Sequence, residues 1–369
     1  MSEVQSPGAV VLLQTGQAVA AHERHVHRHL AMQIAELLGM PFAGVRQGCH
    51  AAPQQYVVPD ATLIAPQPAV RSDADLYGGV VSQPFMAGKA ISHPLIDANA
   101  HAPVGWNERF IQLAGKVVLP GYSAFDVDDA LRAGRRLLEQ GAIRAKQVEA
   151  RAGRGQQVIA SQTELEHWLG QQDRTQVHQE GLVLELNLSE VTTYSVGQAR
   201  VGNLVASYFG TQQLTRTNDG EAVYGGSDLW VVRGDYQALL RQLDMPLARR
   251  VIGLAQRYEQ AAEAAFPGFI ASRRNCDVAV GRDPAGQHCS GVLEQSWRIG
   301  GASSAEIHAL AAFAHDPSLQ RIQAGSWEIY GTAPPIPDGA LVLYQGDDPS
   351  TGPLTTGVRL SPWQPPANP

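Results

Sequence analysis

The stretch that decides the fold is IRAKQVEARAGRGQQVI, residues 143–159. Residues 143–148 and 156–160 flank a loop of small residues, which predicts an antiparallel hairpin. Lys146 stands inside the first strand, from where its ammonium can point at phosphates, and the flexible loop lets backbone N–H groups approach them. No Gly-Lys-Ser/Thr follows, so this is not a Walker loop. Alone, the pattern also fits a solvent-facing lysine before an ordinary turn.

A second informative stretch is CDVAVGRDPAGQHCSGVLEQSWRIGG, residues 276–301. It predicts two antiparallel strands, each with one acidic residue among apolar ones. A carboxylate there is costly to bury unless it is paired or binds a cation. Asp277 and Glu294 could therefore supply oxygen ligands to Mg²⁺, with plain solvent exposure as the alternative. Arg298 adds a fixed positive charge suited to a carboxylate or phosphate.

The third stretch is LVLELNLSEVTTYSV, residues 182–196, and predicts two apolar strands joined by a short connection. Glu185 and Glu190 flank that connection. Such a hinge can present backbone groups to an adenine edge and a carboxylate to ribose hydroxyls. A plain turn with exposed acids is the alternative.

The order and spacing of these three stretches resembles the ATP-grasp superfamily over residues 107–313. The family pattern runs from a strand lysine and a glycine-rich loop through a glutamate-rich hinge to Asp…Glu-x-Asn-x-Arg. The whole chain is also similar to the proteobacterial family "domain of unknown function 3182", with Gly78-Gly79-Val-Val and Ser92-His93-Pro94-Leu among the reminiscent stretches.

The resemblance implies a mixed α/β fold, with an ATP-grasp fold preceded by a small Rossmann-like N-terminal domain. A strand at 10–13 followed by a helix at 21–38 agrees with such an opening. The implied organisation has four parts: an N-terminal α/β domain (1–105), a central lid subdomain (106–190), a C-terminal grasp subdomain (191–331) and a Pro/Gly-rich extension (332–369).

The same resemblance assigns site residues. It implies ATP and Mg²⁺ as cofactors, with the nucleotide held by Arg109, Lys146, Gly153, Arg154, Gly155, Glu185, Leu188 and Glu190. Metal ligands would be Asp277, Glu294 and Ser296, and the developing charge would be stabilised by Arg298 and Arg274. Two departures put catalysis in doubt. Ser296 stands where the family usually has Asn, and the family's earlier lysine falls at Arg109, with Lys116 a poorer fit by spacing.

The activity implied is an ATP-dependent ligase that joins a small-molecule carboxylate to an amine, or to a thiol, through an acyl phosphate. Two alternatives stay open: an ATP-grasp kinase of a small molecule, and a nucleotide-binding regulatory protein without catalysis, which Ser296 favours. The superfamily also suggests a homodimer.

Composition narrows the class of protein. The 369 residues carry a net charge of -7, which argues against a general nucleic-acid binder. Three cysteines without a CxxC pair indicate neither a disulfide framework nor a zinc site. No apolar run approaches bilayer length, and the N-terminus does not resemble a signal peptide. We therefore expect a cytoplasmic protein without a membrane partner.

Two further segments could carry function. His22, His25 and His29 share one face of the helix expected at 21–38 and could form a metal-binding face or touch substrate. A solvated, histidine-rich helix end is the plainer interpretation. Residues 224–230, YGGSDLW, suit either a substrate loop or a surface turn.

Overall fold

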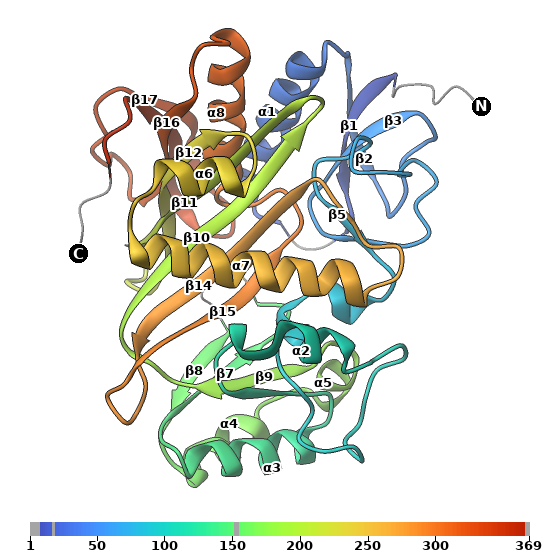
Figure 1. Ribbon diagram of the computed structural model, residues 1–369, viewed down its shortest axis with the longest axis vertical. Helices are drawn as coiled ribbons and strands as arrows, with labels where there is room; N and C mark the ends of the chain where they lie inside the picture. Colours follow the sequence, from blue (N-terminus) through green and yellow to red (C-terminus); the bar gives the residue numbers. More distant parts are fainter. Residues whose placement is uncertain (1–7, 17–18, 151–154, 366–369) are drawn as a thin grey trace.

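The computed structural model describes residues 8–16, 19–150 and 155–365 (Figure 1). It is a mixed α/β fold, as the sequence predicted, and the described residues form four sheets. Within these ranges no helix combines the length and the apolar character that crossing a bilayer requires.

The N-terminal segment forms a parallel three-stranded sheet in the order β2-β1-β3. Its elements are β1 (Ala9–Gln14), α1 (Ala21–Leu38), β2 (Phe42–Gln47) and β3 (Gln55–Pro59). The predicted first strand and helix are confirmed. Val10 and Leu12 of β1 pack with Leu30 and Ile34 of α1, and α1 ends at Gly39, whose φ of 64° is the left-handed conformation that glycine adopts without strain.

The segment between this sheet and residue 105 contains several short elements. It contains β4 (Leu63–Ile64), β5 (Gly79–Val81) and two 3-10 turns, η1 (Pro84–Ala87) and η2 (Lys89–Ser92). β5 pairs with β4 and with β13 (Ile270–Ala271). Phe85 and Ile91 are buried in the main core, which fixes the two turns against the body of the protein.

An antiparallel four-stranded sheet follows, in the order β6-β9-β7-β8. Its strands are β6 (Gly121–Ala124), β7 (Ile143–Gln147), β8 (Gln156–Ile159) and β9 (Leu182–Leu186). The helices that pack on it are α3 (Val127–Leu138), α4 (Gln162–Gly170) and α5 (Arg174–Glu180), whereas α2 (Arg109–Ala114) and η3 (Gly115–Val117) pack against α7 (Pro246–Ala265). The predicted hairpin of β7 and β8 is confirmed. This sheet falls within the predicted lid range of 106–190, although the exact boundaries remain a prediction.

The largest sheet is antiparallel, in the order β15-β14-β10-β11-β12-β16-β18-β17. Its strands are β10 (Ser189–Val201), β11 (Leu204–Arg216), β12 (Ala222–Arg233), β14 (Arg273–Arg282), β15 (His288–Ser296), β16 (Arg321–Tyr330), β17 (Ala340–Asp348) and β18 (Gly352–Ser361). The helices packed on it are α6 (Tyr236–Gln242), α7 (Pro246–Ala265) and α8 (Ser303–His315). β17 and β18 lie in the predicted Pro/Gly-rich extension 332–369.

The two faces of this sheet carry different cores. Phe209 packs with α7, whereas its neighbour Tyr208 packs with α1 and α8, because successive side chains of a strand point to opposite faces. α7 therefore covers one face, and α1 with α8 covers the other (Figure 1). This arrangement brings the N-terminus of α1 beside β17, far from it in sequence.

Candidate functional site

One cleft, of about 650 Å³, contains the predicted metal ligands together with two of the predicted cationic residues. It is lined by β7 and β8 of the four-stranded sheet, by β14 and β15, by β12 and β16, and by the first turn of α1. Five of the predicted site residues line it: Lys146, Asp277, Glu294, Ser296 and Arg298. Lys146 lies more than a hundred residues before the other four in the sequence, and the packing of the two sheets brings it beside them.

The two predicted metal ligands face each other. Asp277 of β14 and Glu294 of β15 are direct partners in the antiparallel ladder, so their side chains lie on one face of the sheet. Burial, together with the Glu294 carboxylate, raises the pKa of Asp277 to about 6. Asn275 donates a hydrogen bond to Asp277 over 2.9 Å, and Ser195 donates a longer one over 3.4 Å.

This pair fits a magnesium ion. Mg²⁺ is commonly held by one or two carboxylates while phosphate and water oxygens complete its shell. Two carboxylates that repel each other, as the raised pKa of Asp277 indicates, gain from a divalent cation placed between them. Among the described residues no group of three or more His, Cys, Asp or Glu side chains could hold a metal ion, so any remaining ligands would be other oxygens.

Lys89 is a cleft residue that the sequence analysis missed. It begins η2 and is 8% exposed, and its Nζ lies 2.8 Å from Oε2 of Glu294. Burial opposes ionisation of Glu294, but the Lys89 ammonium holds the pKa of that carboxyl below its ordinary value. The sequence did contain a signal for Lys89: it is the single lysine inside the apolar run PFMAGKAISHPL, residues 84–95.

Arg109, predicted to replace the family's earlier lysine, lies elsewhere. It begins α2 with its side chain exposed, and it is not among the described residues that line the cleft. The nucleotide contact predicted for Arg109 therefore remains a prediction. The buried turns η1 and η2 carry a different cation, Lys89, into the cleft from earlier in the chain.

Lys146 is held by a buried acidic partner. Its Nζ lies 2.5 Å from Oε1 of Glu185, and Nε2 of His93 lies 3.3 Å from the other oxygen of that carboxylate. Burial alone would raise the pKa of Glu185, but Lys146 and His93 lower it to about 2. Gly121 permits this packing, since a Cβ there would come within 2.8 Å of the His93 ring. Glu185 thus sits behind the lysine rather than on the cleft wall.

The other hinge residues lie outside the cleft lining. Leu188 is buried in a small cluster with Leu119 and Ala279. Glu190 is exposed and receives a hydrogen bond of 2.9 Å from Arg282. In this conformation neither side chain borders the space where a ligand could lie, so their predicted adenine and ribose contacts remain predictions.

The glycine-rich loop is only partly visible. Gly155 is described, with a φ of 63°, and Gln156 next to it lines the cleft. Gly153 and Arg154 lie outside the described residues. The sequence placed the loop over the nucleotide, and that placement stays a prediction.

Arg274 was predicted to stabilise charge in the site, but the neighbouring Arg273 occupies the cleft face. Arg273 lies on the same face of β14 as Asn275 and Asp277, whereas Arg274 points to the other side and pairs with Glu263. The role predicted for Arg274 remains a prediction, and Arg273 is the arginine of β14 that lines the cleft. Counting in steps of two from Asp277 would have selected Arg273.

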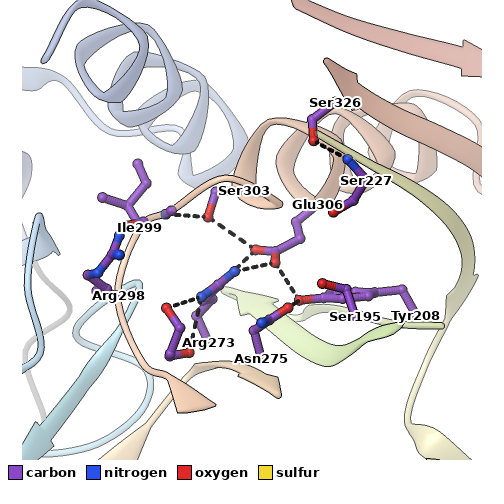
Figure 2. Close-up of polar contacts among 12 residues, drawn as sticks. Ser195, Tyr208, Ser227, Arg273, Asn275, Arg298, Ile299, Ser303, Glu306 and Ser326 are labelled. Carbon is purple, nitrogen blue, oxygen red and sulfur yellow. Dashed lines mark hydrogen bonds and ion pairs between the residues drawn. The ribbon is translucent and has the colours of Figure 1, made fainter. Parts of the chain in front are cut away.

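Arg273 is one end of a buried polar network (Figure 2). Its Nε and Nη2 donate to the two oxygens of Glu306 over 3.0 and 2.7 Å. Tyr77 and Tyr208 donate to the same carboxylate, and Tyr208 lies 2.9 Å from Asn275. Because Asn275 donates to Asp277, the network positions the Asp277 carboxylate of the predicted metal-ligand pair.

Ser296 is also engaged by this network. Nη1 of Arg273 donates to the Ser296 hydroxyl over 2.9 Å and to its carbonyl over 3.0 Å. A hydroxyl oxygen that already accepts from a guanidinium is a weak metal ligand, since a positive charge stands beside it. Ser296 therefore fits a metal site less well than Asp277 and Glu294.

Comparison with solved structures shows the fold. The chain resembles the biotin carboxylase domain of the Hydrogenobacter thermophilus 2-oxoglutarate carboxylase, with a TM-score of 0.53, 13% identity, and coverage of 97% of this chain and 87% of that one. It also resembles Rhizobium etli pyruvate carboxylase, with a TM-score of 0.51, 9% identity, and coverage of 99% of this chain and 36% of that one. No curated protein matches the sequence.

The family comparison covers nearly the whole chain. Residues 10–357 match the family described as "Protein of unknown function (DUF3182)". The solved structures that it resembles have the ATP-grasp fold, in agreement with the lysine strand, the hinge and the carboxylate ladder described above. The chain therefore belongs to the DUF3182 family and has the ATP-grasp fold.

Proposed function

We propose that this protein binds MgATP at the end of the cleft formed by β7, β14 and β15. The observation that carries the proposal is the facing pair Asp277 and Glu294, with the cations Lys89, Lys146 and Arg298 in the same cleft and each acting to lower the pKa of Glu294. Several positive charges around two carboxylates suit a polyphosphate with its magnesium ion. Asp277 and Glu294 would hold the metal, which would neutralise charge on the phosphates.

We further propose that the protein is an ATP-dependent ligase. A substrate carboxylate would attack the γ-phosphorus of ATP and release ADP, and an amine would then attack the carbonyl carbon of the acyl phosphate and release phosphate. Positioning and charge neutralisation would supply most of the catalysis. Arg298 lines the cleft beside Gly300, where it could bind the carboxylate. A related fold supports this proposal, but one fold hosts many chemistries.

One observation favours a protein that binds nucleotide without catalysis. Lys89 pairs with Glu294, and Arg273 donates to Ser296, so two of the three predicted metal ligands already have cationic partners. If these contacts persist when nucleotide binds, the metal would be held weakly. A small-molecule kinase shares the same binding site and differs only in the fate of the phosphorylated substrate.

Calorimetric titration of ATP, with and without Mg²⁺, tests the binding site in the native protein and in Glu294→Gln. Asp228→Asn, an exposed carboxylate on β12, is the matched control. We expect magnesium-dependent binding that only Glu294→Gln weakens. No binding by folded native protein would overturn the proposal.

A second assay separates the three activities. A panel of carboxylates is incubated with MgATP and hydroxylamine, which converts acyl phosphates to hydroxamates. Hydroxamate together with ADP supports a ligase. A stable phosphorylated product formed without any amine supports a kinase, and binding without ADP release across the panel supports a regulatory protein.

A further inference from the structure

Lys89 contacts two parts of the cleft with one ammonium group. Its Nζ lies 2.8 Å from Oε2 of Glu294 on β15, and it donates a hydrogen bond of 2.9 Å to the backbone carbonyl of Ala150, in the connection that follows β7. The residue is 8% exposed, so both contacts are largely shielded from water. An ammonium carries three N–H donors and no acceptor, and these two contacts use two of the donors.

The backbone of η2, which carries this lysine, is fixed to β15. Gln295 of β15 donates to the carbonyl of Gly88, the residue before η2, over 2.8 Å. Tyr258 donates to the same glutamine side chain over 2.8 Å, and its hydroxyl lies 3.0 Å from that of Ser92, the last residue of η2. Because both ends of η2 are held in this way, a change of hydrogen-bond partner has to come from the flexible four-carbon side chain of Lys89.

The two proposed metal ligands differ in what contacts them. Asp277 accepts from neutral groups: the amide of Asn275 over 2.9 Å and the hydroxyl of Ser195 over 3.4 Å. Glu294 is instead paired with the ammonium of Lys89. A cation therefore stands at one carboxylate of the pair, and neutral donors stand at the other.

A magnesium ion and the Lys89 ammonium compete for Glu294. An oxygen that accepts from an ammonium cannot also hold a metal ion without placing two positive charges in contact. A metal ion on the other oxygen of Glu294 would still share one carboxylate with the ammonium and be repelled by it. The ammonium must therefore move to another acceptor before Asp277 and Glu294 can hold Mg²⁺ together.

We infer that Lys89 keeps Mg²⁺ from the pair of Asp277 and Glu294 until the phosphates of ATP accept its ammonium, so that metal and nucleotide bind together. Phosphate oxygens are strong, charged acceptors, and a lysine on a fixed backbone can reach them by rotation of its side chain alone. The same movement frees Glu294 for the metal. This inference rests on the proposed MgATP site and adds the residue that makes metal binding depend on nucleotide.

Binding of Mn²⁺ in the absence of ATP, with Mn²⁺ as a spectroscopic probe for Mg²⁺, tests the inference. Electron paramagnetic resonance measures the free ion in native protein and in variants. Native protein should bind Mn²⁺ weakly, whereas Lys89→Met, which removes the competing charge, should bind it about 10-fold more tightly. Lys89→Arg keeps the charge and should resemble the native protein. Lys116→Met removes a lysine charge at an exposed position and should change nothing.

Titration of the same samples with ATP and Mg²⁺ should give a change of opposite sign. Lys89→Met should bind ATP about 10-fold more weakly than native protein, because it lacks a charge-assisted contact to phosphate. A folding defect would lower both affinities, so a gain for Mn²⁺ together with a loss for ATP is specific to this role of Lys89. The double variant Lys89→Met/Glu294→Gln should lose the gain in Mn²⁺ affinity, which would locate that gain at Glu294.

Two results would overturn the inference: Mn²⁺ binding by Lys89→Met that is no tighter than that of native protein, and tight Mn²⁺ binding by native protein without ATP. The ATP titrations keep the two proposals apart. No ATP binding by folded native protein would reject the nucleotide site and this inference with it. ATP binding by native protein, without a gain of Mn²⁺ affinity in Lys89→Met, would reject this inference alone.

Discussion

Lys146 and Glu185 form a buried ion pair across neighbouring strands, with 2.5 Å between Nζ and Oε1 and 1% of the Glu185 side chain exposed. Lys146 lines the cleft, whereas Glu185 lies behind it. The lysine therefore has two roles that can be separated by mutation: it compensates a buried carboxylate, and it presents a positive charge to the cleft.

Lys146→Met should destabilise the protein by about 3 kcal/mol, because it leaves the Glu185 carboxylate buried with only His93 as a partner. The double variant Lys146→Met/Glu185→Gln should recover most of that stability but not the binding of ATP. Urea denaturation and ATP titration measure the two effects. Lys116→Met, at an exposed position, is the control. Full ATP binding by the double variant would contradict a nucleotide role for Lys146.

Asp277→Asn should weaken ATP binding about 10-fold or more in the presence of Mg²⁺ and much less in its absence, since the amide lacks the charge that attracts the metal. Titrations of ATP at several Mg²⁺ concentrations measure the difference. Asp228→Asn should behave as the native protein does. An unchanged magnesium dependence in Asp277→Asn would show that the carboxylate ladder holds no metal.

Glu306→Gln should cost about 3–5 kcal/mol of unfolding free energy, because Arg273 is 1% exposed and loses its charged partner. Removing the exposed pair of Glu190 and Arg282 with Glu190→Gln should cost less than about 1 kcal/mol. Chemical denaturation compares the two. A similar small loss in both variants would mean that the buried network does not stabilise the fold.

Glu259 should make stability depend on pH. Burial raises its pKa to about 7, so the folded protein favours the protonated form. The contribution of Glu259 is present below its unfolded pKa and is lost as the pH rises through about 7, by about 3 kcal/mol in total. Native protein should therefore lose more stability between pH 5 and pH 8 than Glu259→Gln, as pH-dependent urea denaturation can measure. Parallel curves for the two proteins would show that Glu259 ionises normally.

Local sequence patterns predicted much of the fold. Alternation of apolar and polar residues reveals the buried face of a strand, and a hairpin depends only on residues close in sequence. The strand pairs β7 with β8 and β14 with β15 were therefore predicted correctly. The same locality put Asp277 and Glu294 on one predicted strand pair. The face of a strand was harder to choose: Arg274 was selected, but Arg273 is the one that lines the cleft, as alternation from Asp277 indicates.

Sequence alone was enough for the class of fold and for the two carboxylates, Asp277 and Glu294, on neighbouring strands, because these depend on short-range periodicity and on the spacing of charged residues. Only the tertiary structure decided which distant groups meet: Lys89 with Glu294, Lys146 with Glu185, and His22 with Asp348, 326 positions along the chain. Such pairs depend on how sheets and helices pack, and that packing is set by burial summed over the whole core rather than by any one segment.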